Sequence, residues 1–116
     1  MVTRLTKGRL KVTISETRAE LGEVAAREVG AYIRSLLETK PEVNIIFASA
    51  PSQNDFLANL LLEEIDWSRV NAFHMDEYIG IDPHAPQAFG QFLRDRIFSK
   101  KTFKSVNYID SKAADP

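Results

Sequence analysis

The stretch Val43-Asn44-Ile45-Ile46-Phe47-Ala48 decides the fold prediction, because it is a nearly continuous apolar run rich in β-branched and aromatic residues. Such a run favours a strand that is covered on both faces, as in a parallel sheet. The following Ser49-Ala50-Pro51-Ser52 is typical of a turn. Apolar residues then repeat at helical spacing, at Phe56, Leu57, Leu60, Leu61 and Ile65. We therefore expect a strand, a turn and a helix, with Ser52 or Asn54 as the N-cap.

The sequence before this stretch predicts another strand and a long helix. Residues 10 to 14 alternate and carry β-branched side chains, which favours a strand. Ser15 is the expected N-cap of a helix over residues 16 to 38, which ends at Thr39-Lys40-Pro41. Gly22 and Gly30 each weaken such a helix by about 1 kcal/mol relative to alanine. Its predicted apolar stripe comprises Leu21, Val24, Ala25, Val29, Tyr32, Ile33 and Leu36.

The sequence after this stretch continues the alternation of strands and helices. A strand is predicted over 70 to 75, a loop over 76 to 86, a helix from Phe89 to Ile97, and a last strand over 106 to 109. This order predicts a single α/β domain over residues 1 to 116, built on a parallel sheet with helices on its faces.

Composition excludes several classes of protein. The 116 residues include 15 Lys and Arg and 16 Asp and Glu, so the net charge of −1 argues against nucleic-acid binding through bulk positive charge. The absence of cysteine excludes disulfide scaffolds, Cys-ligated zinc and thiol catalysis. No apolar run approaches the ~18 residues of a membrane span, and the N-terminus lacks the apolar stretch of a signal peptide. We expect a cytoplasmic protein without membrane attachment.

The turn after the first predicted buried strand is a candidate anion site. A helix that begins there offers free N–H groups and a positive dipole end, and the hydroxyls of Ser49 and Ser52 add hydrogen bonds to a phosphate. An ordinary turn with a serine N-cap explains the same residues. Both interpretations stay open at this point.

Phe73-His74-Met75-Asp76-Glu77-Tyr78 is the second candidate segment, at the end of another predicted strand. A carboxylate that is partly removed from water beside a second carboxylate can have its pKa raised towards neutrality, as a general base needs. Alternatively, Asp76 and Glu77 cap the loop and face solvent while His74 is a hydrogen-bonded core residue. A metal site is disfavoured, because strand alternation sends neighbouring side chains to opposite faces.

The two segments together resemble the glucosamine-6-phosphate deaminase (isomerase) family, which is grouped with the 6-phosphogluconolactonases. The hallmark string Met-Asp-Glu-Tyr-x-Gly is matched fully by residues 75 to 80. Further similarity lies in Ile65–Val70, Pro86–Phe89 and Val106–Ile109. Lactonase relatives usually carry Asp-Glu-Arg, so Tyr78 favours the deaminase branch.

This resemblance implies a doubly wound parallel sheet with helices on both faces, similar to ribose-5-phosphate isomerase. It also implies a phosphorylated amino sugar as substrate, without cofactor or metal, and a ketose phosphate and ammonia as products. Asp76 matches the base that moves a proton between C2 and C1, and Glu77 matches a supporting residue. Ser49, Ala50, Ser52 and Gln53 match the substrate-binding loop.

The sequence departs from the family pattern in two ways. The family loop usually reads Thr-Gly-Gly-Thr, whereas residues 49 to 52 keep the hydroxyls, lose the glycines and include Pro51, which has no N–H. The later half of the family, with an Asp-x-His motif, a ring-opening glutamate and basic residues, has no counterpart here. We therefore expect an inactive N-terminal half that exposes apolar surface and self-associates. A phosphogluconolactonase-like hydrolase and a non-catalytic sugar-phosphate sensor are the alternatives.

Overall fold

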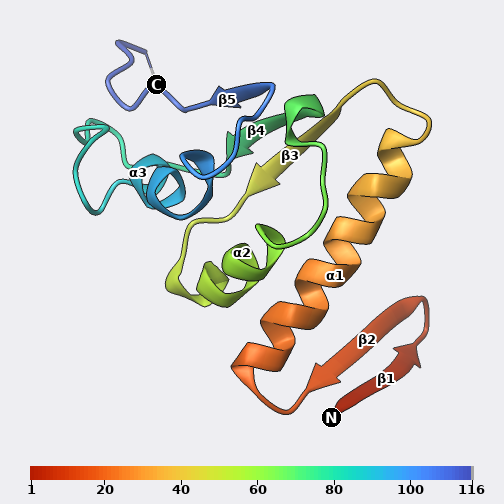
Figure 1. Cartoon of the computed structure of the whole chain (residues 1–116). Helices are drawn as coiled ribbons and strands as arrows, with labels where there is room; N and C mark the ends of the chain where they lie inside the picture. Colours follow the sequence, from red (N-terminus) through yellow and green to blue (C-terminus); the bar gives the residue numbers. More distant parts are fainter. Residues whose placement is uncertain (116) are drawn as a thin grey trace.

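The computed structural model describes residues 1–115, and its body is a three-stranded sheet with helices below it and an N-terminal hairpin that lies beside the beginning of α1, away from the sheet (Figure 1). Short 3₁₀ turns cover Pro51–Gln53 and Trp67–Arg69, and a π-helical turn over Arg94–Phe98 extends the last helix. No helix among the described residues is long and apolar enough to cross a membrane. The helices and strands, in chain order, are β1 (Val2–Lys7), β2 (Leu10–Ser15), α1 (Arg18–Leu37), β3 (Val43–Phe47), α2 (Asn54–Leu60), β4 (Val70–His74), α3 (Phe89–Leu93) and β5 (Ser105–Asn107).

The sheet has the order β3-β4-β5, and both pairs are parallel, which confirms the predicted parallel α/β fold. Val43 lies opposite Val70 and Phe47 opposite His74, so β3 and β4 begin and end together. Helix α2 connects β3 to β4, and α3 with its π-helical turn connects β4 to β5. The core joins one face of the sheet to all three helical segments through Ala26, Ile33, Leu37, Val43, Phe47, Leu57, Leu60, Trp67, Val70, Ala72, Leu93, Ile97 and Phe98.

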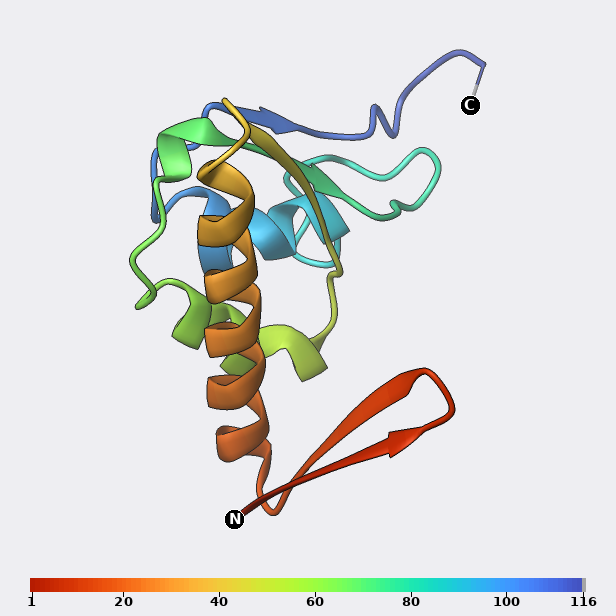
Figure 2. The same cartoon turned by 90° about the vertical axis from the view of Figure 1, so that its right-hand side faces the viewer.

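The opposite face of the sheet is open. Ile46 is 69% exposed and Asn44 is exposed, so the prediction that both faces of this strand are covered is wrong for the described residues. The helices lie on the other side of the sheet (Figure 2). We call this surface the open face; by strand alternation it consists of Asn44, Ile46, Asn71, Phe73, Ser105 and Asn107.

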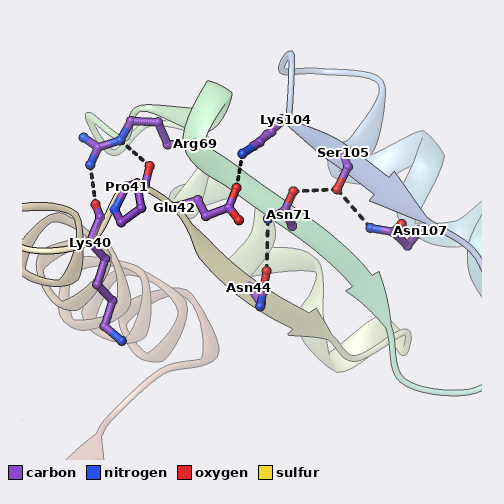
Figure 3. Close-up of polar contacts among 9 residues, drawn as sticks. All are labelled: Lys40, Pro41, Glu42, Asn44, Arg69, Asn71, Lys104, Ser105 and Asn107. Carbon is purple, nitrogen blue, oxygen red and sulfur yellow. Dashed lines mark hydrogen bonds and ion pairs between the residues drawn. The ribbon is translucent and has the colours of Figure 1, made fainter.

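A row of side-chain hydrogen bonds crosses the open face. The Asn71 amide donates to Asn44 Oδ1 at 3.0 Å and accepts from the Ser105 hydroxyl at 2.6 Å, and the Asn107 amide donates to that hydroxyl at 3.0 Å. Figure 3 shows these bonds running from β3 through β4 to β5. The polar side chains of the open face therefore bond to one another across all three strands.

The hairpin β1–β2 corrects the sequence prediction. The predicted strand over residues 10 to 14 pairs antiparallel with β1, from Val2 opposite Ser15 to Lys7 opposite Leu10, and is not part of the parallel sheet. Gly8 takes a φ of +61° in the connecting turn, a conformation that glycine adopts without steric cost. The sequence analysis did not predict β1, because charged and hydroxyl side chains interrupt the apolar pattern by which a strand is identified.

Helix α1 begins later and buries a different stripe than predicted. Thr17 is the N-cap, because its side chain accepts from the Glu20 N–H at 3.1 Å, and Ser15 ends β2 instead. Tyr32 is 65% exposed and Leu21 is 52% exposed, so neither is a core residue. The buried positions are Gly22, Val24, Ala26, Gly30, Ile33 and Leu37.

Two glycines allow α1 to lie close to α2 and the residues after it. A Cβ on Gly22 would be 2.7 Å from Asp55 Cβ and 2.9 Å from the Asp55 carbonyl carbon, and one on Gly30 would be 2.6 Å from a Glu63 carboxylate oxygen. The low helix propensity of glycine is therefore offset by close packing. The cost of about 1 kcal/mol in helix propensity that the sequence predicts for each glycine does not include the close packing that the absence of a side chain allows.

Arg69 joins the C-terminal end of α1 to the beginning of β4. Its guanidinium donates to Leu37 O at 2.8 Å, to Pro41 O at 2.9 Å and to the Lys40 carbonyl, and Figure 3 shows its contacts with Lys40 and Pro41. These carbonyls lack helical partners, so an arginine that bonds them stabilises the helix end. The distant arginine gives no local sequence signal for this cap.

The substitution Gly22→Ala tests the close approach of α1 and α2. We expect it to lower the free energy of unfolding by about 1–3 kcal/mol, because the added methyl group overlaps the Asp55 backbone. Urea unfolding followed by circular dichroism measures the change. Ser35→Ala, on the exposed side of the same helix, is the control and should change stability by less than about 0.5 kcal/mol. A gain of about 1 kcal/mol in Gly22→Ala, the usual helix-propensity effect, would contradict the packing.

Candidate functional site

The two candidate segments leave the same edge of the sheet. Residues 49 to 53 follow β3, and residues 75 to 78 follow β4. The Met75 N–H donates to Phe47 O at 3.1 Å, which continues the strand pairing to the point where the segments separate. Ligands of open α/β sheets bind beyond the carboxyl ends of the strands, so this edge is the candidate site.

The loop after β3 begins its helix without a side-chain cap. A 3₁₀ turn over Pro51–Gln53 precedes α2, with the Gln53 N–H bonded to Ala50 O at 2.8 Å. The predicted N-cap roles of Ser52 and Asn54 are therefore wrong, because the turn replaces the cap and Asn54 Oδ1 instead accepts from Arg96 Nε at 2.7 Å. Ser49 Oγ is buried and has no hydrogen-bond partner among the described residues.

Arg18 holds this loop against the first turn of α1. Its guanidinium donates to Pro51 O and pairs with the Asp55 carboxylate at 2.8 Å. A cavity of about 330 Å³ lies here between α1 and the loop, and Ser52 and Gln53 line it together with Arg18. The sequence analysis missed Arg18, because no local pattern connects a residue at position 18 with a loop about thirty positions later.

His74 is a core residue. It is 5% exposed, its Nε2 accepts from the Ile109 N–H at 2.7 Å, and its ring contacts Tyr108 edge-on. Because the backbone N–H donates, Nε2 is unprotonated and the ring proton is on Nδ1, which has no partner among the described residues. The structure thus favours the structural interpretation of this histidine, which ties the end of β4 to the segment after β5.

Glu77 binds the N-terminus of α3. One carboxylate oxygen accepts from the N–H groups of Tyr78 and Phe89, each at 3.0 Å, and the other accepts from Gly90 at 2.9 Å. Burial alone would raise the pKa of Glu77, but these three backbone bonds outweigh burial and hold its pKa below the ordinary value. The hypothesis that a raised pKa prepares this carboxylate for base catalysis is therefore wrong for Glu77.

Asp76 is exposed at the carboxyl edge, immediately before this bonded glutamate. The loop beyond it is also held in place, since Tyr78 stacks on Phe89 at 4.8 Å and the Gly80 N–H donates to Ser111 O at 2.6 Å. The structure thus brings the strand ends that carry Asp76 and Ser49 together.

The cavities at this edge remain separate within residues 1–115. Among the described residues, no cavity at this edge is lined both by Asp76 and by the loop over residues 49 to 53. Glu77 lines a second cavity of about 290 Å³ with His84 and Arg94, two residues that the sequence analysis did not assign to the site. The Arg94 guanidinium lies over the Tyr108 ring at 4.7 Å, and its Nη1 is 3.2 Å from His84 Nδ1. The described residues contain no group of three or more His, Asp or Glu side chains placed to hold a metal ion.

The fold is shared with solved enzymes of two kinds, a glucosamine-6-phosphate deaminase and 6-phosphogluconolactonases. A solved monomeric glucosamine-6-phosphate deaminase superposes with a TM-score of 0.74 and 21% identity over 87% of this chain and 43% of that one. A 6-phosphogluconolactonase from Shewanella baltica superposes with a TM-score of 0.72 and 16% identity, over 85% of this chain and 44% of its own.

The sequence is similar to curated glucosamine-6-phosphate deaminases. Glucosamine-6-phosphate deaminase of Lactobacillus delbrueckii is 23% identical over 106 residues, which are 91% of this chain and 43% of the relative. Glucosamine-6-phosphate deaminase 2 of Bacillus subtilis is 28% identical over 77% of this chain and 36% of the relative. The predicted resemblance to glucosamine-6-phosphate deaminases is therefore confirmed. The chain spans less than half the length of these relatives, and no protein-family model matches it.

Stability at acid pH tests the Glu77 bonds. The pKa of Glu77 is lowered in the folded state, so its stabilising effect is present above the ordinary value of 4.5 and is lost as the pH falls through the folded-state pKa. At pH 7 we expect Glu77→Gln to lower the free energy of unfolding by about 1–3 kcal/mol, because an amide nitrogen cannot accept a backbone N–H. Urea unfolding between pH 7 and pH 3 should show this difference shrinking below pH 4.5. A difference that stays constant over that range would contradict a charged Glu77 in the fold.

Proposed function

We propose that the chain is the N-terminal half of a deaminase that acts on a phosphorylated amino sugar. The observation that carries the proposal is the position of Asp76, an exposed carboxylate at the end of β4 beside the hydroxyl-bearing loop that follows β3. Similarity to the named deaminases over most of the chain supports it. The position of both segments beyond the carboxyl ends of parallel strands also supports it, since ligands of open α/β sheets bind there.

In the proposed reaction, Asp76 acts as the base on the ring-opened sugar. It takes the proton from C2 and returns it to C1, which shifts the double bond and leaves an imine at C2. Water adds to the imine carbon, ammonia leaves, and a ketose phosphate remains. A positioned base of this kind contributes about 10²–10⁴-fold to the rate.

Ser49, Ala50, Ser52 and Gln53 form the proposed substrate-binding loop. The cavity beside Ser52 and Gln53 also contains Arg18, whose positive charge favours an anion such as a phosphate. Pro51 has no N–H, so Arg18 supplies donor groups near a position where a backbone donor is absent. Part of the guanidinium charge is balanced by Asp55.

We infer that this half is inactive by itself. The chain spans 43% of one deaminase relative, and among the described residues the cavity that the loop lines is not lined by Asp76. A catalytic site needs its binding groups and its base around one substrate. We therefore propose that residues outside this chain join the two parts of the site, and that the reaction needs no metal or cofactor because the substrate carbonyl and amine carry the electronic changes.

A 6-phosphogluconolactonase-like hydrolase is the second candidate, because two solved lactonases share the fold with TM-scores of 0.72 and 0.71. Tyr78, in place of the arginine that lactonase sequences usually carry, favours the deaminase. A non-catalytic sugar-phosphate sensor is the third candidate, supported by the altered loop with Pro51.

A titration with glucosamine 6-phosphate, followed by amide NMR, tests binding of the sugar phosphate at the proposed site. We expect shifts at residues 49 to 53 and 76 to 78, and we expect binding to survive in Asp76→Asn, since that carboxylate acts on carbon-bound protons. Asp82→Asn is the matched control, because it removes the same charge from the same exposed loop and its amide oxygen can still accept from the His84 N–H. The absence of any shift with glucosamine 6-phosphate would overturn the deaminase proposal.

Turnover is measured separately, as ammonia and fructose 6-phosphate released from glucosamine 6-phosphate. We expect none above background from residues 1–116. Clear turnover that Asp76→Asn reduces at least 100-fold and Asp82→Asn preserves would establish the reaction and contradict the need for further residues. Hydrolysis of a phosphogluconolactone without ammonia release would favour the lactonase candidate.

A further inference from the structure

The turn that carries Asp76 is held at both ends by side chains from its immediate neighbours. We propose that Glu77 is a positioning residue for Asp76, which it fixes by binding the N-terminus of α3, and that His74 supports the same turn from β4. This assignment rests on the proposed function only for the role of Asp76 as base. The contacts of Glu77 themselves do not depend on that function.

The contacts of Glu77 leave it little freedom to transfer protons. Its two carboxylate oxygens accept three backbone N–H groups, from Tyr78, Phe89 and Gly90, at 2.9 to 3.0 Å. A carboxylate with both oxygens engaged in this way stays ionised and holds its bonded groups in one arrangement. The neighbouring Asp76 is exposed. The two adjacent carboxylates therefore have different roles, one structural and one facing the substrate edge.

The other side of the turn is held through β4. The Met75 N–H bonds Phe47 O at 3.1 Å, and His74 accepts the Ile109 N–H at 2.7 Å. Asp76 is thus the second residue after β4, it follows Met75, which continues the pairing with β3, and it precedes the residue that bonds α3. Its backbone therefore has fixed points before and after it, at Met75 and at Glu77.

Gly90 lies in close contact with the side chains around the beginning of α3, above all with Tyr108. A Cβ at position 90 would lie 3.0 Å from Tyr108 Cδ1, 3.4 Å from Glu77 Oε2 and 3.5 Å from His74 Cε1. Gly90, whose N–H donates to Glu77, therefore lies against the side chains of Tyr108, Glu77 and His74. This crowding places His74, Glu77 and Tyr108 in one packed group around the α3 N-terminus.

The matched pair Glu77→Gln and Asp82→Asn tests the proposal. Both variants remove one negative charge from the loop between β4 and α3, but only the first removes acceptors of the α3 N–H groups. In Glu77→Gln we expect amide exchange at Phe89 or Gly90 to rise about ten- to a hundred-fold, and the heteronuclear NOE of residues 76 to 78 to fall. Amide exchange at Leu60 and Val70, in the core, should stay unchanged in Asp82→Asn and should rise in Glu77→Gln only as far as the loss of global stability measured by urea unfolding requires.

The sugar-phosphate titration separates positioning from general destabilisation. With glucosamine 6-phosphate, Glu77→Gln should keep the shifts at Ser52 and Gln53 and lose the shift at Asp76, whereas a destabilised fold would weaken all of them together. An unchanged heteronuclear NOE at residues 76 to 78, or a rise of exchange at Phe89 and Gly90 that is no larger than the rise at Leu60 and Val70, would overturn the proposal. If the unsubstituted chain shows no shifts at all, the proposed function fails, and the NOE and exchange measurements still decide the role of Glu77.

Discussion

The arrangement of this protein depends on the burial of one face of the β3–β4 pair against α1 and α2. Val43, Phe47, Val70 and Ala72 are almost completely buried, and they set the register of the two strands. Because these strands are parallel and end together, both polar segments leave the sheet at one edge. The candidate site is therefore a consequence of core packing, since a shift in register would separate the segments.

Close helix packing is the second condition for this core. Gly22 and Gly30 allow α2 and the residues after it to approach α1 within a distance that a methyl group would prevent. Arg69 supports the C-terminal end of this helix by bonding Leu37 O, at the last residue of α1, and Pro41 O in the turn that follows. Helix α1 is thus in contact with other parts of the chain at both ends and along its middle. Arg18, in its first turn, bonds Pro51 O in the loop that we propose to bind substrate.

The open face and the divided site are consistent with one half of a larger fold. The described helices cover one side of the sheet, and the chain superposes on 43% of a solved deaminase. The polar row from Asn44 to Asn107 gives this face internal hydrogen bonds, while Ile46 remains exposed. We propose that the groups needed to join the loop and Asp76 around one substrate come from the rest of that fold.

Within the candidate site, residue types were predictable and their chemical states were not. The string Met75–Gly80 identified Asp76 and Glu77 as a pair, but the sequence does not show that α3 would direct three N–H groups at Glu77. These bonds reverse the predicted direction of its pKa shift. His74 likewise needed its partner Ile109, 35 positions later, before its role as a core residue was clear.

The sequence by itself determined the alternation of strands and helices, the parallel sheet and the family resemblance, because these depend on local patterns of apolar residues and on one short string. The tertiary structure alone decided which stripe of α1 is buried, that β2 pairs with β1, and that Arg18, Arg69 and Arg94 contact distant segments. The physical reason is that burial and hydrogen bonding depend on neighbours brought together by folding. Residues tens of positions apart carry no local pattern that records such contacts.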